Sequence, residues 1–364
     1  MLPNASLLAM RRFLFSFLSF LFLTTLVQLT YAESRPLRIG LIAPMSGDLA
    51  DYGVAAANGA TLAIELAPGA AATLIVEDNR SCGPSDAVTG AQKLVNIDKV
   101  DIVMTVCTGA AQGVLPIVKA RNVPLFQLTE SGPDPENYMI KLMPDSVGLV
   151  EVLAEKYVKR YSKMALIGAS VQVNTGERGN LLLFKQKFEG LGGKIVFYEE
   201  FPSDVLDFRS TITRIRRSGA QAVIPFLAPT QQLAAFLKQG DELNLWKEVH
   251  LAGNFFFEFM LKELKTIYPA VQKLNGLESA NLAQLTTPQF LADYQKRFGK
   301  PAPQFADYAY DATAIIKRCA LDKACYRRPF DGVSGEVAFD ASTDRRLGKF
   351  VSRTLKDGEF VDSR

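Results

Sequence analysis

Short apolar runs alternate with longer amphipathic stretches from Arg38 onward. Buried parallel strands read as continuous apolar runs, and each pair of them needs a long connection that is usually a helix. Alternation of this kind therefore predicts an α/β protein with mainly parallel sheets.

The first set of alternating segments ends near Pro144. Its apolar runs predict strands at 37–43, 73–77, 101–106 and 124–127. Its amphipathic stretches predict helices at 53–66, 85–95 and 110–120. These elements together make one Rossmann-like lobe.

A second alternating set follows directly and predicts another sheet. Its expected helices are 147–161, 176–190, 208–218 and 231–239, and its expected strands are 164–168, 194–198, 222–227 and 249–252. After these the pattern favours helices at 288–298 and 304–320, then antiparallel strands at 335–339 and 349–355.

The second sheet begins before the helices of the first lobe are complete, so we expect the chain to cross between two lobes several times. The expected limits are 33–146 with 252–326 for the first lobe, and 147–251 with 327–364 for the second. A multi-strand hinge would join them.

The N-terminus has the composition of a secretory signal. Arg11 and Arg12 precede an apolar stretch at 13–29, and small residues occupy the third-last and last positions before a cleavage position after Ala32. A permanent anchor is the alternative, because the apolar stretch is close to the lower length limit for a membrane span. We expect cleavage of residues 1–32 and export to the periplasm.

Charge and length change the picture only slightly. Removal of residues 1–32 leaves 332 residues, more than one hydrophobic core usually serves. It leaves 39 basic and 38 acidic residues, a near-neutral balance that offers no general attraction to nucleic acid. We expect a small-molecule partner, no nucleic acid, and a monomer.

Four cysteines lie in the exported part, and an even number in an oxidising compartment predicts two disulfides. Pairing between neighbours joins Cys82 to Cys107 and Cys319 to Cys325. The second bond requires a helix to end between its cysteines, because six helical residues rise about 9 Å. Free thiols or a metal pair are the alternatives, although a single histidine gives a zinc site few ligands.

Several short motifs occur in a fixed order along the chain. They are the opening segment 39–47 with Tyr52–Gly53, followed by 77–82, 107–109, 123–133, 207–209, 218–220, 310–312 and 330–335. In sequence and order they resemble the type I periplasmic solute-binding proteins of the branched-chain amino acid ABC transporter family, whose first strand and loop are similar to 39–47. The resemblance implies two lobes that close around a solute in the periplasm and deliver it to a membrane permease.

The resemblance also implies a carboxylate-binding half of the pocket. Open α/β sheets bind ligands beyond the carboxyl ends of their strands, where Thr108, Gly109, Thr129 and Ser131 occur. Backbone N–H groups at a helix start stabilise a carboxylate, and the hydroxyls add hydrogen bonds. Helix capping is the alternative role for the hydroxyls. Tyr52 matches a position that contacts the ligand side chain, with core burial as its alternative.

Departures from the family concern the ammonium-binding half. In the resembling amino-acid binders an acid follows the strand equivalent to 249–252, whereas this chain has Asn254 and Phe255, and Glu258 comes later than that acid. The second lobe's aromatic positions are replaced by Ala228 and by Asn174 or Thr175. Glu130 could supply a substitute charge. We therefore hypothesise a carboxylate or amide ligand with an apolar or aromatic body and no required α-ammonium group.

Other chemistry has little support in the sequence. His250 is the single histidine and begins an apolar strand, and no nucleophile-elbow or metal-ligand pattern occurs, so we expect neither an enzyme nor a cofactor. The glycines at 190–193 follow a helix, the reverse of a dinucleotide loop. A domain that senses a ligand for a receptor or regulator, rather than for a permease, is the main alternative function.

Overall fold

The structure is a computed structural model of the chain. It describes residues 35–47, 49–80, 82–129, 136–144, 146–169, 175–202, 204–227, 229–283, 285–340 and 346–363. The signal segment and cleavage position expected at 1–32 lie outside these residues.

The first sheet has five parallel strands in the order β2-β1-β3-β4-β5. Their bounds are β1 (Leu37–Ala43), β2 (Ala72–Asp78), β3 (Ile102–Thr105), β4 (Leu125–Gln127) and β5 (Met139–Lys141). Strand β1 is an interior strand, with Ile39 paired to Leu74 of β2 on one side and to Ile102 of β3 on the other. The continuous apolar runs in the sequence correspond to this two-sided burial.

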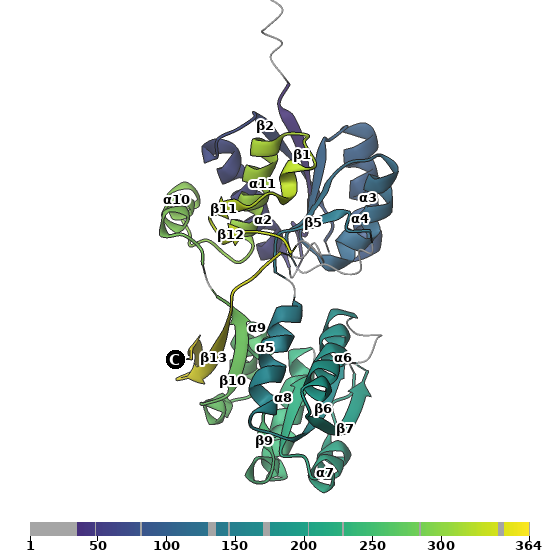
Figure 1. The fold of residues 1–364 in the computed structure, drawn as a ribbon, viewed down its shortest axis with the longest axis vertical. Coiled ribbons are helices and arrows are strands. Elements are labelled where there is room, and N and C mark those ends of the chain that lie inside the picture. The colour runs from purple at the N-terminus through teal and green to yellow at the C-terminus, as the bar shows by residue number, and fades with distance from the viewer. Residues whose placement is uncertain are drawn as a thin grey trace, which may run out of the picture.

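Helices cover both faces of the first sheet (Figure 1). On one face, α2 (Ala50–Leu66) and α11 (Ala306–Cys319) share a core with Ile39 and Leu41. On the other, α3 (Pro84–Gln92) and α4 (Thr108–Ala120) share a core with Ile42 and Val103. Helix α10 (Pro288–Phe298) packs on α2. We call this body the first lobe.

Close contact between α2 and α11 depends on a glycine. A Cβ atom at Gly59 would lie 1.9 Å from the carbonyl oxygen of Ala306, at the start of α11. Any larger side chain would push the two helices apart.

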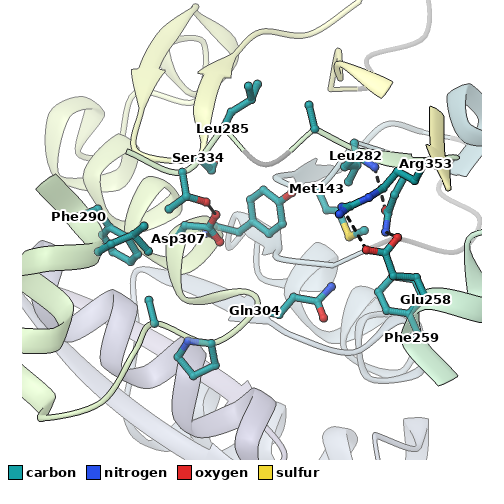
Figure 2. Close-up of a pocket in the computed structure, with 17 residues that line it drawn as sticks. Met143, Glu258, Phe259, Leu282, Leu285, Phe290, Gln304, Asp307, Ser334 and Arg353 are labelled. Atoms are coloured by element: carbon teal, nitrogen blue, oxygen red, sulfur yellow. Dashed lines mark hydrogen bonds and ion pairs between the residues drawn. The ribbon is translucent and has the colours of Figure 1, made fainter. Parts of the chain in front are cut away.

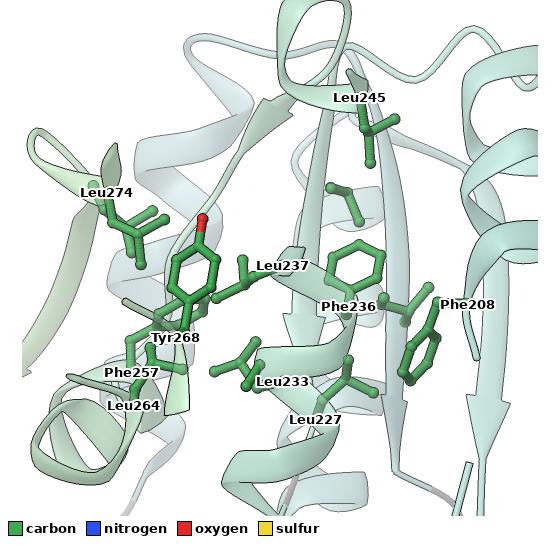
Figure 3. Packing of buried hydrophobic residues seen from close by; sticks show 14 of the residues in the cluster. Phe208, Leu227, Leu233, Phe236, Leu237, Leu245, Phe257, Leu264, Tyr268 and Leu274 are labelled. Carbon is green, nitrogen blue, oxygen red and sulfur yellow. The ribbon is translucent and has the colours of Figure 1, made fainter. Parts of the chain in front are cut away.

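The second sheet has four parallel strands in the order β7-β6-β8-β9. Their bounds are β6 (Lys163–Ala169), β7 (Lys194–Phe201), β8 (Ala222–Phe226) and β9 (His250–Leu251). Helices α5 (Ser146–Val158) and α6 (Thr175–Gly190) cover one face. On the other lie α7 (Arg209–Arg217), α8 (Thr230–Glu242) and α9 (Phe256–Ile267), whose core includes Phe208, Phe236 and Leu264 (Figure 3).

A small antiparallel sheet in the order β10-β13-β14 flanks the second sheet. It consists of β10 (Glu278–Leu282), β13 (Phe350–Lys356) and β14 (Glu359–Asp362). Leu277, Leu355 and Phe360 join the core of Figure 3. We call the second sheet, its helices and this small sheet the second lobe. A separate hairpin of β11 (Phe330–Gly332) and β12 (Gly335–Val337) lies on the first lobe.

The chain passes between the lobes at three described places: from β5 to α5, from β10 to α10, and from β12 to β13 (Figure 1). The segment before β13 approaches the segment after β5 closely, since a Cβ atom at Gly348 would lie 2.5 Å from the Cβ of Pro144. The crossing segments therefore run side by side and form the hinge.

The predicted α/β fold with two parallel sheets is confirmed. Strands β5 and β10 were not predicted, because three and five residues of mixed polarity give too short a signal. The limits of the two lobes stay a prediction. Residues 256–282 lie in the second lobe's core and small sheet, although the sequence placed 252–326 in the first lobe. Their apolar side chains pack against residues distant in sequence, and the local pattern does not show that packing.

Both expected disulfides are present, Cys82–Cys107 and Cys319–Cys325. Helix α11 ends at Cys319, and Ala320 turns the chain with a φ of 49°. This helix end, which the predicted bond requires, brings the Cα atoms of the second pair to 5.5 Å, within disulfide range.

Candidate functional site

The carboxyl edges of both parallel sheets face the hinge. Strand β5 runs directly into the segment that begins α5, so the first sheet's strands end at the crossing. Helix α5 leads away from the crossing and β6 returns toward it, which turns the second sheet's strand ends back to the same place. Parallel α/β sheets bind ligands at this edge, and here two such edges meet.

The loop after β1 is held by a carboxylate at the end of β2. Asp78 accepts hydrogen bonds from the backbone N–H groups of Met45 and Arg80, each at 2.8 Å, and from the Ser46 hydroxyl at 2.6 Å. The bond from Ser46, with those from the backbone, lowers the pKa of Asp78 below its ordinary value. The loop that leads into α2 is thus fixed by an ionised side chain.

Tyr52 lies in the first turn of α2, and its side chain is not in the core. The residue is 38% exposed, and its ring meets the ring of Phe305 edge to face with centroids 5.2 Å apart. Phe305 has a φ of 73° and precedes α11, a conformation that sequence pattern does not reveal. The two rings form an aromatic rim on the first lobe, and the alternative of core burial for Tyr52 does not hold.

Helix α4 starts where β3 ends, with Thr108 as its first residue and both Thr108 and Gly109 partly exposed. The disulfide from Cys107 to Cys82 holds the preceding loop against this end. Gly109 is required by that contact, because a Cβ there would lie 2.6 Å from the Cys82 carbonyl oxygen. The helix start carries the partial positive charge that stabilises an anion.

Thr129 follows β4 and is tied into the first lobe. Its hydroxyl donates to the carbonyl oxygen of Val106 and accepts from the Gln127 amide at 2.8 Å. Gln127 in turn accepts from Thr105. The Thr129 hydroxyl proton is therefore engaged in this conformation, and a ligand carboxylate would have to compete for it. Glu130 and Ser131 lie outside the described residues.

The ligand contacts predicted on the second lobe are more buried than those on the first lobe. Asn254 is fully buried: its amide donates to the Pro225 carbonyl at 2.6 Å and its oxygen accepts from the Phe256 N–H at 2.9 Å. Phe255 is 2% exposed and lies against Phe256. Both residues lie in the connection from β9 to α9, and both side chains are buried in this conformation. Thr175 begins α6, and Ala228 and Asn174 lie outside the described residues.

A cavity of about 470 Å³ lies between the lobes beside the hinge (Figure 2). The first lobe contributes Gln304, Asp307, Tyr308 and Ser334, and the second contributes Glu258, Phe259, Asn281 and Arg353. Its volume falls within the usual range for small-molecule sites. None of the described residues that the sequence predicted for ligand binding lines this cavity. Its lining residues Pro303 and Gln304 directly precede Phe305 of the aromatic rim.

Opposite charges compensate each other on the second lobe's wall of the cavity. Arg353 pairs with Glu258 at 3.1 Å, and the Asn281 amide donates to the other Glu258 oxygen at 2.8 Å (Figure 2). Phe259 beside them is 46% exposed. Glu258, which the sequence placed too late for a ligand role, reaches the cavity because α9 begins at the cleft, yet its charge is already partnered.

A buried polar network fixes the first lobe's side of the hinge. The Asp311 carboxylate accepts from the N–H groups of Val333 and Ser334, at 2.7 and 3.0 Å, and from the Ser334 hydroxyl. Arg346 donates to Ser334 and to the carbonyl oxygen of Leu142, so it joins two crossing segments. Burial raises the pKa of Asp311 to about 6 and lowers the pKa of Arg346. The motifs at 310–312 and 330–335 contain Asp311, Val333 and Ser334, but the sequence did not indicate that these residues are hydrogen-bonded to each other.

Within the described ranges, no group of three or more metal-ligating side chains forms a candidate metal site. In the same ranges, no helix combines the length and apolarity needed to cross a bilayer. His250 lies in β9 with its ring 5.7 Å from the ring of Tyr161.

The sequence profile of a family described as periplasmic binding protein matches residues 36–346. A leucine-, isoleucine-, valine-, threonine- and alanine-binding protein of Pseudomonas aeruginosa is 26% identical over 219 residues. That alignment covers 57% of this chain and 58% of the relative, so the chain spans less than two thirds of that protein's length.

Solved structures share the fold at lower identity. A solute-binding protein of an ABC transporter from R. palustris, in complex with benzoate, has a TM-score of 0.67 at 18% identity and covers 90% of this chain and 95% of its own. A branched-chain amino acid transporter substrate-binding protein from Streptococcus pneumoniae, in complex with isoleucine, has a TM-score of 0.68 at 19% identity, with coverages of 90% and 100%.

Proposed function

Because this chain belongs to the periplasmic binding protein family, we propose that it is the solute-binding component of an ABC uptake transporter. In this role the two lobes close around one small molecule at the facing sheet edges. A membrane permease would then recognise the closed form. Export to the periplasm by a cleavable signal and a monomeric state belong to the same proposal.

The start of α4 is the observation that carries the proposal. It combines a helix N-terminus, a partly exposed Thr108 and a glycine that permits close approach, all beside a disulfide-held loop. Such an end stabilises an anionic group, so we propose Thr108 and Gly109 as carboxylate contacts. Tyr52, Thr129 and Ser131 complete the proposed first-lobe contacts, and Thr175 and Ala228 are proposed for the second lobe.

We propose an organic acid or amide with an apolar or aromatic body as the ligand. The rings of Tyr52 and Phe305 offer an apolar surface at the rim. On the second lobe, the Asn254 side chain is hydrogen-bonded to backbone groups and Glu258 is paired with Arg353. Neither residue therefore offers an unpartnered acceptor to an α-ammonium group. Glu130 is the remaining acid that we propose near the carboxylate contacts. Solved relatives of this fold hold benzoate in one case and isoleucine in another, so the fold accepts either class.

Calorimetric titration of the purified protein tests the ligand class. Benzoate, 4-hydroxybenzoate, leucine and valine are titrated separately, and we expect the aromatic acids to bind more tightly than the amino acids. Thr108→Val removes a hydroxyl that would contact a charged group. It should weaken binding about tenfold or more, since hydrogen bonds to charged groups contribute about 1.5–3 kcal/mol.

The matched control is Thr213→Val on α7, where the hydroxyl binds only the Arg209 carbonyl of its own helix. This variant should bind as the unchanged protein does. Tight leucine or valine binding that exceeds binding of the aromatic acids would overturn the proposed ligand class. Equal affinities for Thr108→Val and the control would remove Thr108 from the site.

Transport and sensing differ in the partner rather than in the pocket. Deletion of the gene should abolish uptake of the bound solute if the protein delivers it to a permease. Uptake that stays unchanged, while expression of other genes responds to the solute, would support the sensing alternative.

A further inference from the structure

A second cavity, of about 520 Å³, lies on the first lobe away from the hinge. Its walls come from the turn after α2, from one face of α11 and from the edge of β11. It shares no lining residue with the cavity of Figure 2, whose α11 contacts are Asp307 and Tyr308. It is therefore a separate site.

Small and aromatic residues make this second cavity apolar. Ala67 and Ala314 form its floor, and both belong to a buried cluster with Ala63. Tyr310 and Phe330 pack against that cluster and are partly exposed. Alanines leave space where larger side chains would fill the gap between the helices, so an apolar guest would contact both rings and the floor.

One cation stands at the edge of the cavity. The Arg318 guanidinium lies over the ring of Phe330, 4.7 Å from its centroid. Its hydrogen bonds to the carbonyl oxygens of Arg328 and Pro329 are long, at 3.5 and 3.4 Å. In the part of the chain that the structure describes, no carboxylate lies within ion-pair distance of it. An anion could pair with it without breaking a strong contact.

Two carboxylates, Asp311 and Asp331, also line the cavity, where Arg318 is the one cation among the described lining residues. Asp311 is fully buried, and its oxygens accept from Val333 and Ser334. Asp331 is exposed to solvent, where its charge is screened. Arg318 is thus the charge best placed to meet a ligand.

Spacing along α11 gives the cavity a direction. Tyr310, Ala314 and Arg318 stand four residues apart on one helix face, so they span about 12 Å at 1.5 Å per residue. The charge lies at one end of this row and apolar groups occupy the rest. An elongated guest with a single anionic end matches both features.

We propose that this cavity binds a medium-chain alkanoate, with the alkyl chain over the Ala67 and Ala314 floor and the carboxylate on Arg318. This site lies outside the interlobe site of the proposed function and does not depend on it. Its ligand is recognised by charge at one end and by length, rather than by enclosure between lobes.

Calorimetric titration with octanoate, below its micelle-forming concentration, tests the proposal in the purified protein. We expect saturable binding at one site. Arg318→Gln should weaken octanoate binding about tenfold or more, because a charge-assisted contact is lost. The same variant should bind the neutral probe 1-octanol as the unchanged protein does, since the apolar floor remains.

Arg217→Gln on α7 is the matched control, because Arg217 is an exposed arginine far from the cavity. Ala314→Leu, which fills the floor, should lose both probes. If that variant proves unstable, Arg318→Gln still decides the matter, because Arg318 is exposed. Absence of octanoate binding to the unchanged protein, or equal binding by Arg318→Gln and Arg217→Gln, would overturn the proposal.

Discussion

At the residue scale, the hinge depends on a buried carboxylate with several donors. Both Asp311 oxygens accept from N–H groups, of Val333 and Ser334, and the Ser334 hydroxyl is shared with Arg346. A buried network of this kind contributes most when every member is satisfied. Asp311 sits on α11, so it couples the first lobe's core to the segment that crosses to the second lobe.

The raised pKa of Asp311 predicts a pH dependence of stability. Its pKa is about 6 in the folded protein against 3.8 for an ordinary aspartate, so the folded state binds the proton more tightly than the unfolded state. The associated stabilisation is complete below about pH 4 and is lost as pH rises through about 6. The loss amounts to about 3 kcal/mol on a linkage estimate.

Urea unfolding of the unchanged protein and of Asp311→Asn, at pH 4 and at pH 7, measures this effect. The asparagine cannot titrate, so the difference in unfolding free energy between the two proteins should shrink between pH 4 and pH 7. At both pH values the variant should be less stable, because its amide N–H₂ would face another donor. A difference that stays constant with pH would contradict the raised pKa.

At the element scale, α2 and α11 are joined by a lysine. Lys317 is 6% exposed, and its ammonium group donates to the carbonyl oxygens of Ala63, at 3.1 Å, Ile64, at 2.8 Å, and Ala67. These carbonyls belong to the last turn of α2 and its end, and that of Ala63 also accepts from the backbone N–H of Ala67 at 2.9 Å. Burial lowers the pKa of Lys317. One side chain therefore caps a helix that it does not belong to.

Lys317→Met should destabilise the protein by about 2–3 kcal/mol, because it leaves buried carbonyl groups without a charged donor. Chemical unfolding at neutral pH measures the change. Lys238→Met on α8 is the control, since Lys238 is exposed, and its unfolding free energy should change by less than about 0.5 kcal/mol. Equal effects of the two substitutions would show that the cap contributes nothing.

At the scale of the whole molecule, three crossing segments connect the two lobes. We propose lobe limits that follow from the cores: the second lobe takes 146–282 with 350–363, and the first takes the rest of the described chain. Motion about such segments gives an open and a closed form, and a ligand that contacts both lobes favours the closed one.

Closure predicts a measurable change in shape. Small-angle scattering should show a smaller radius of gyration when the protein is saturated with the acid that binds best in calorimetry. Gly348→Ala should weaken both the compaction and the affinity, because its Cβ would lie 2.5 Å from Pro144 and 3.1 Å from the Phe350 ring in the hinge.

Gly179→Ala on α6 is the control, because no atom lies within 4 Å of a Cβ there. It should close as the unchanged protein does. Identical scattering with and without ligand, in a protein that calorimetry shows to be saturated, would contradict hinge closure.

The sequence by itself predicted the α/β class, most of the longer helices and strands, and the pairing of the cysteines that the structure has. These depend on local properties: buried parallel strands give continuous apolar runs, helices give a regular period, and neighbouring cysteines need only a turn or a helix end between them. The family's motifs also placed Thr108 and Gly109 at a strand end. That position is where the structure has the start of α4.

Only the tertiary structure decided which of the predicted ligand contacts are exposed. The sequence predicts Phe255 and Asn254 as pocket residues. In the structure, Phe255 is buried in the second lobe and the Asn254 amide donates to the backbone of β8. Asp311 and Arg346 are 35 positions apart and both bind the Ser334 hydroxyl, and Lys317 reaches a helix more than 250 positions earlier. Burial and pairing at such separations depend on how distant elements pack together, which no local pattern encodes.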